Sequence, residues 1–99
     1  MFGLTTTSGY GRTVITLSGD LDGTCKATVL EALAAAEASG DRYVDFDLGG
    51  VHSIDPSCIA CLIEAEIRLT SAGIEMVIVK ASLDVMRQLT KVDYLDRLT

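Results

Sequence analysis

The sequence has little positive charge. Only eight of its 99 residues are Lys or Arg, and they are scattered along the chain, which leaves a formal net charge of −6. Binding to nucleic acid or to anionic lipid requires clustered Lys and Arg side chains that neutralise phosphate groups. The composition therefore predicts a protein that binds neither nucleic acid nor a membrane, and an acidic domain favours basic protein partners.

Long apolar runs are also missing. No segment approaches the roughly 18 consecutive apolar residues that span a bilayer. Residues 1–9 contain neither the basic region nor the apolar run of a signal peptide. These absences predict a cytoplasmic protein, in which the three cysteines are expected to be reduced thiols and not a disulfide framework.

Residues suited to catalysis are scarce. His52 is the only histidine, so neither a His-centred metal site nor a Ser-His-Asp arrangement can be assembled, and no phosphate-binding glycine loop follows a predicted strand. Asp45-Phe46-Asp47 resembles the D-x-D motif of haloacid dehalogenase phosphatases, but the apolar strand before it is too short for that family. We therefore expect no enzyme activity, no metal and no cofactor.

The first half of the chain shows a hairpin followed by a helix. Segments 2–6 and 13–17 are rich in Thr, Val, Ile and Leu, and the turn residues between them predict a hairpin. Residues 19–23 are a predicted turn. The following pattern predicts a helix over 24–39 that ends at Gly40, with an apolar stripe of Leu30, Leu33 and Ala34.

The second half alternates strands and helices. Strict alternation over 43–48 predicts a strand with Val44, Phe46 and Leu48 facing the core, and 49–54 reads as a loop. A helix over 56–72 has an apolar face of Cys58, Cys61, Leu62, Ala65 and Leu69 beside a row of Ile59, Ile63 and Ile67. After a strand at 75–80, Ser82 is predicted to cap a helix carrying Val85, Met86, Leu89 and Val92.

This order of elements predicts one α/β domain over residues 1–99, with a mixed sheet and helices packed mainly on one face. Strand–helix–strand units require parallel pairing with right-handed crossovers. In open α/β sheets, sites gather at the carboxyl ends of the strands. We therefore expect Asp20, Asp22 and Ser57, which follow different strands, to lie on one face of the molecule.

Asp55-Pro56-Ser57 opens the second helix. Asp55 is a good N-cap and Pro56 suits the first helical position, so Ser57 lies where free N–H groups and the helix dipole favour negative charge. A phosphate there would carry about −1.5 to −2 charges beside neighbouring carboxylates, and two unit charges ~6 Å apart interact by ~3 kcal/mol at a dielectric near 20. From these residues alone, a plain helix cap remains the alternative interpretation.

Three segments together indicate a family: Leu17–Asp22, Val44–Val51 and Ile54–Ser57. With their spacing, the chain resembles the STAS domains of anti-sigma factor antagonists. The resemblance implies a transcription regulator that binds an anti-sigma factor kinase until a serine at the start of the second helix is phosphorylated. It implies Ser57 as the phosphoacceptor and Asp22 in the partner-binding loop. The residues expected to bind the partner are Asp20, Asp22, Gly23, Asp55, Pro56, Cys58, Ile59 and Ile63.

Two residues depart from the usual family motif, and they leave alternatives open. The family reads Asp-Ser-Ser-Gly or Asp-Thr-Ser-Gly, whereas this chain has Pro56 before the serine and Cys58 after it. The alternative function is a STAS scaffold that binds its partner without phosphorylation. With either function, the protein is expected to be a monomer or a weak dimer. Cys58-Ile59-Ala60-Cys61 also allows a thiol-redox switch, although cysteines on a core-facing row usually act as small hydrophobes. Ile59 and Ile63 fit either the core or a partner-facing patch.

Overall fold

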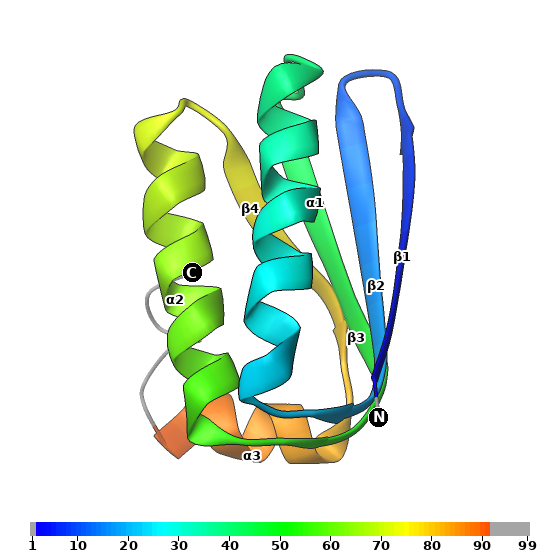
Figure 1. Ribbon diagram of the computed structural model, residues 1–99, viewed down its shortest axis with the longest axis vertical. Coiled ribbons are helices and arrows are strands. Elements are labelled where there is room, and N and C mark those ends of the chain that lie inside the picture. The colour runs from blue at the N-terminus through cyan, green and yellow to red at the C-terminus, as the bar shows by residue number, and fades with distance from the viewer. Residues whose placement is uncertain (1, 92–99) are drawn as a thin grey trace.

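The computed structural model describes residues 2–91 and contains a four-stranded mixed sheet (Figure 1). The strands β1 (Phe2–Gly9), β2 (Arg12–Leu21), β3 (Tyr43–Ile54) and β4 (Glu75–Ala81) lie in that order. β1 and β2 form the predicted antiparallel hairpin, and β2, β3 and β4 are parallel. The carboxyl ends of the three parallel strands therefore meet at one end of the sheet.

Two helices cover one face of this sheet. α1 (Lys26–Ala38), preceded by the short 3-10 turn η1 (Gly23–Cys25), and α2 (Pro56–Ser71) lie side by side, and α3 (Leu83–Lys91) crosses the end of the sheet (Figure 1). The Ile54 N–H donates to Asp84 Oδ2 at 3.0 Å, which ties α3 to the end of β3. The predicted α/β architecture, with helices mainly on one face, is confirmed.

The hydrophobic core lies between the sheet and the α1–α2 layer. The alternation over 43–48 is confirmed, because Val44, Phe46 and Leu48 are fully buried. On α2, the predicted apolar face is also confirmed: Cys58, Cys61, Leu62, Ala65 and Leu69 are all buried. Removing apolar surface from water stabilises a fold by about 25 cal/mol per Å². Because most of the buried apolar side chains lie in this layer, it is the main source of stability.

Residues 19–21 of the predicted turn and the whole of the predicted loop 49–54 are strand residues instead, and Asp22 and Gly23 lie beyond the end of β2. β2 continues through Gly19 and Asp20 to Leu21, and β3 continues to Ile54. Parallel pairing extends over these residues, with Leu21 opposite Ile54. The register shifts twice, between Thr16 and Ser18 and between Gly19 and Asp20, and at each shift β3 contains one residue more than β2. Gly19 has φ +84°, a conformation that glycine adopts without steric cost. Because Gly and Asp are typical of turns, their presence in these segments led to strand ends predicted too early in the chain.

The predicted stripe on α1 is shifted. The buried residues are Val29, Ala32, Leu33 and Ala36, so Leu33 is confirmed, whereas Leu30 is only half-buried and Ala34 is exposed. α1 is rich in alanine on every side, so its apolar pattern does not select one face. Contact with both the sheet and α2 decides which residues are covered.

The third helix begins and packs as expected at most positions. The Val85 N–H donates to Ser82 Oγ at 3.4 Å, and Val85 and Leu89 are buried. Met86, from the same apolar set, is 45% exposed. Val92 lies outside the described residues. Within residues 2–91, none of the helices combines the length and the apolar character that a bilayer crossing requires.

Candidate functional site

The site predicted at the strand ends lies where β2 is followed by η1 and β3 is followed by α2. The Asp55 N–H donates to the Leu21 carbonyl at 3.0 Å, which joins the start of α2 to the end of β2. Gly23 then packs against Ser57: a Cβ added to Gly23 would lie 3.4 Å from Ser57 Oγ. The end of the sheet therefore brings together residues about 34 positions apart in the chain, as expected for parallel strands.

Asp55 caps α2, as predicted. Its backbone is extended (φ −94°, ψ 167°), and its Oδ1 atom accepts from the Cys58 N–H at 3.2 Å and from Ser57 Oγ at 2.5 Å. Pro56 occupies the first turn, where its missing N–H costs no helical hydrogen bond. The Ser57 side chain is exposed, so its hydroxyl can be reached from solvent.

Asp22 caps η1. Its Oδ1 atom accepts from the Thr24 N–H at 2.9 Å and from Thr24 Oγ1 at 2.5 Å. These two bonds, with the Thr24 hydroxyl making the larger contribution, lower the pKa of Asp22 below its usual value. Asp22 therefore stays ionised on the exposed surface beside Gly23.

Asp20 projects from the last residues of β2 toward β3. Its Oδ1 atom accepts from Ser53 Oγ at 2.7 Å and lies 3.1 Å from His52 Nδ1. The Ser53 hydroxyl is the main cause of the lowered pKa of Asp20, followed by His52. His52, expected as a loop residue, is thus an exposed strand residue with an aspartate partner. The three predicted residues lie at one end of the sheet, and Asp55 is the carboxylate that contacts Ser57 directly.

The starts of α1 and α2 also bring together cysteine side chains. Cys25 Sγ lies 2.8 Å from Cys58 Sγ, and the Cys58 thiol donates to the Asp22 carbonyl at 2.7 Å. Burial, followed by the contact with Cys25, raises the pKa of Cys58, and burial also raises the pKa of Cys61. Cys25 was not predicted from the sequence as part of this site. The one signal for it is its position at the start of a helix, which it shares with Cys58.

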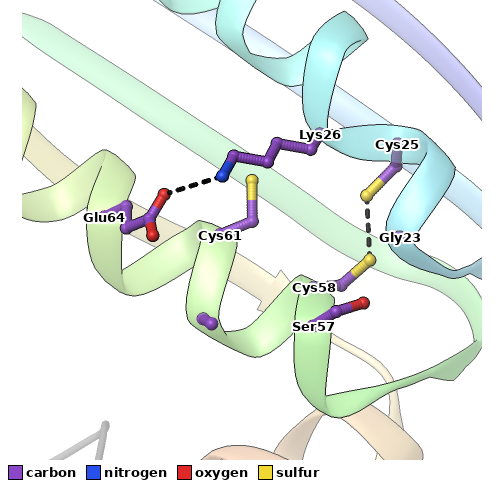
Figure 2. A pocket seen from close by; sticks show the side chains of 8 residues that line it. Gly23, Cys25, Lys26, Ser57, Cys58, Cys61 and Glu64 are labelled. Atoms are coloured by element: carbon purple, nitrogen blue, oxygen red, sulfur yellow. Dashed lines mark hydrogen bonds and ion pairs between the residues drawn. The ribbon is translucent and has the colours of Figure 1, made fainter.

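A pocket of about 220 Å³ separates these two helix starts. Figure 2 shows its walls, and the Lys26 ammonium and the Glu64 carboxylate meet across it at 3.5 Å. Eight residues line it: Gly23, Cys25, Lys26, Ser57, Cys58, Ala60, Cys61 and Glu64. Among residues 2–91, no three His, Cys, Asp or Glu side chains are grouped so that they could hold a metal ion.

Comparison with known proteins assigns the family. The family model described as "Mlab, STAS domain" matches residues 5–99. The chain belongs to the STAS domain family. A search of curated proteins found no match for it.

Solved structures share the fold of this STAS domain at low sequence identity. An anti-sigma factor antagonist from Mycobacterium paratuberculosis is 18% identical, with a TM-score of 0.80, over 98% of this chain and 81% of that chain. The Bacillus cell fate determinant SpoIIAA in its phosphorylated form is 17% identical, with a TM-score of 0.72, over 99% and 87%. The STAS domain of an antisigma-factor antagonist from Rhodobacter sphaeroides is 22% identical, with a TM-score of 0.62, over 79% and 85%.

Two residues expected to contact a partner belong to the core of the STAS domain. Cys58 and Ile59 are 2% and 4% exposed. The expectation that the Cys58 side chain contacts a partner is therefore corrected, since Cys58 faces Cys25. Of the two positions left open for Ile59, the structure selects the core, so Ile59 is withdrawn from the expected partner contacts. Ile63 is half-buried and Ile67 is 54% exposed, so the isoleucine row emerges from the core along the length of α2.

The D-x-D pair on β3 is occupied by structural contacts. Asp45 is buried and accepts two hydrogen bonds from Arg12, at 2.5 and 2.7 Å. Asp47 Oδ1 accepts from the Gly49 N–H at 3.1 Å. Both carboxylates are thus engaged in hydrogen bonds within the sheet, Asp45 with β2 and Asp47 within β3.

Proposed function

We propose that this STAS domain is a cytoplasmic anti-sigma factor antagonist that regulates transcription by protein binding and not by catalysis. In its unphosphorylated form it binds an anti-sigma factor of the Ser/Thr kinase type, and phosphorylation of Ser57 releases that partner. The observation that carries the proposal is the exposed Ser57 hydroxyl in the first turn of α2, packed beside Gly23.

The charge of a phosphate explains how release would occur. The Ser57 hydroxyl now donates to Asp55 at 2.5 Å, and esterification of Oγ removes that donor. The phosphate brings about −1.5 to −2 charges, and two unit charges ~4 Å apart interact by ~4 kcal/mol at a dielectric near 20 before salt screening. Because each 1.4 kcal/mol changes affinity tenfold, phosphorylation can dissociate a complex without changing the fold.

The surface around Ser57 suits a partner with basic side chains. Asp20 and Asp22 are exposed and ionised, and Pro56 and Gly23 are exposed beside them. Complementary charge raises association rates and favours the correct partner. The residues that we propose for partner contact are therefore Asp20, Asp22, Gly23, Asp55, Pro56 and the half-buried Ile63.

The test compares two exposed serines at the same end of the sheet. The wild-type chain, Ser57→Ala and Ser53→Ala are incubated with ATP and an anti-sigma factor kinase from the same organism, and the phosphorylated residue is mapped by mass spectrometry. We expect phosphate on Ser57 in the wild-type chain and in Ser53→Ala, and none in Ser57→Ala. Ser57→Glu should bind the kinase more than tenfold more weakly than Ser57→Ala. Phosphorylation at another residue, with Ser57 unmodified, would overturn the proposal.

A second candidate is a STAS scaffold that binds its partner constitutively. The observation in its favour is the pair of residues around the serine, where Pro56 and Cys58 replace the usual hydroxyl residue and glycine. An unmodified Ser57 after incubation with a kinase that nevertheless binds the chain would select the scaffold. The inward direction of Cys58 supports the switch, because this side chain leaves the surface beside Ser57 free.

A further inference from the structure

We propose that Cys25 and Cys58 are a disulfide-forming pair, and that a small peroxide entering the pocket between α1 and α2 oxidises them. The pairing differs from the Cys58–Cys61 switch that the sequence motif allows. It joins two segments that are far apart in the chain, since 33 positions separate the two cysteines. The reaction requires no other protein.

The position of the two sulfur atoms carries this inference. Cys25 Sγ and Cys58 Sγ face one another at 2.8 Å across the gap between η1 and α2 (Figure 2). A disulfide has its sulfur atoms about 2.05 Å apart, so a small movement of either side chain brings them to bonding distance. Cys61 also lines the pocket, but its sulfur is directed toward Lys26, one helical turn away from Cys58.

The pocket provides the route for the oxidant. Both cysteines are only 2% exposed, which by itself would protect them. They nevertheless line a pocket of about 220 Å³ that also reaches the exposed residues Gly23 and Ser57. A water molecule occupies about 30 Å³ of liquid, so hydrogen peroxide, with two oxygen atoms, fits inside this space.

The chemistry proceeds in two balanced steps. Cys25 sulfur attacks one oxygen of hydrogen peroxide; an S–O bond forms, the O–O bond breaks, and water leaves with the thiol proton. Cys58 sulfur then attacks the Cys25 sulfenic acid; the S–S bond forms, the S–O bond breaks, and the Cys58 proton leaves in a second water. The two thiols lose two electrons in total, and the peroxide accepts them. Cys58 is therefore the resolving cysteine. In the reduced protein its thiol donates a hydrogen bond to the Asp22 carbonyl.

The first experiment maps the bond in the wild-type chain. The reduced protein is treated with hydrogen peroxide, alkylated, and digested without reductant for mass spectrometry. We expect a peptide pair linked through Cys25 and Cys58, with Cys61 alkylated, and full reversal by dithiothreitol. A Cys58–Cys61 bond, oxygen adducts without a bond, or links between chains alone would overturn the proposal.

The second experiment uses three matched Cys→Ser variants and thiol counting under denaturing conditions. Peroxide should reduce the count from three to one in the wild-type chain and from two to none in Cys61→Ser. The count should stay at two in Cys25→Ser, which lacks the thiol that attacks the peroxide. In Cys58→Ser the count should fall to one without a disulfide, because Cys25 sulfenic acid forms and has no resolving thiol. Because a cross-link over 33 positions restricts the unfolded chain, oxidised Cys61→Ser should also unfold at higher urea concentration than its reduced form. An equal midpoint for the two forms would contradict a bond made within the native fold.

Discussion

Two carboxylates at the end of the sheet, Asp22 and Asp55, accept hydrogen bonds from residues close to them in the chain. Asp55 accepts from the Ser57 hydroxyl and the Cys58 N–H, while Asp22 accepts from both donors of Thr24. A cap depends on residues two or three positions away, so it can be predicted from the local sequence. The cap at Asp55 was predicted in this way, and the one at Asp22 has the same local basis. The contact between Cys25 and Cys58 was not foreseeable in this way, since nothing local relates two residues on different helices.

The hydroxyl of Thr24 is the main cause of the lowered pKa of Asp22, and this gives a pH prediction. A carboxyl group with a lower pKa in the folded chain stabilises the fold above its ordinary value of 3.8. That contribution disappears as pH falls through the lowered value, because the unfolded chain then binds more protons.

Replacing Thr24 with valine should therefore raise the pKa of Asp22 toward 3.8. The pKa should remain below that value, because the Thr24 backbone N–H still donates to Asp22. The measurement is an NMR titration of the side-chain carboxyl carbon. Thr28→Val, which changes a threonine on α1 itself, is the control and should leave the pKa in place. An unchanged pKa of Asp22 in Thr24→Val would show that the Thr24 hydroxyl is not the cause of the lowered value.

Helices differ in how clearly their own residues define a buried face. α2 carries large apolar residues at regular spacing, and its predicted face is confirmed. α1 is built largely from alanine, and alanine is small enough to be tolerated in solvent or in the core. The buried side of α1 is therefore set by its neighbours, the sheet and α2, and its own pattern leaves the choice open.

A matched pair of substitutions on α1 tests this assignment. Ala36 is 2% exposed, whereas Ala34 lies on the solvent side. Ala36→Leu should reduce the free energy of unfolding by about 1–3 kcal/mol, because added methyl and methylene groups overfill the core. Ala34→Leu, with the same change in helix propensity, should stay within about 0.5 kcal/mol of the wild type. Urea denaturation followed by circular dichroism measures both, and equal losses would mean that the two faces of α1 are misassigned.

The fold as one unit depends on a single core, to which β3 contributes Val44, Phe46 and Leu48. Phe46 is the largest of the fully buried side chains, at 0% exposure, and it lies on a strand paired on both sides. Small single domains usually unfold in one cooperative transition. Loss of this side chain should therefore lower the stability of all elements together.

Phe46→Ala is expected to cost about 3–5 kcal/mol, a large part of the 5–15 kcal/mol typical of a domain. Phe2→Ala, which removes the same ring from a half-buried position on the edge strand β1, should cost clearly less. Thermal unfolding measured in the near- and far-ultraviolet would give coincident transitions for each variant. Separate transitions in the two spectral ranges would contradict a single cooperative core.

The sequence alone was enough for the class of fold, the order of the elements, the alternating face of β3 and the caps at Ser82 and Asp55. Each of these depends on a period or on a hydrogen bond within a few residues, so the information is local. Three features depended on the tertiary structure: the extension of β2 and β3 beyond their expected ends, the buried side of α1, and the contact between Cys25 and Cys58. These features arise from strand pairing and helix packing between segments that are far apart in the chain. A local sequence pattern does not specify which distant segment will pack against it.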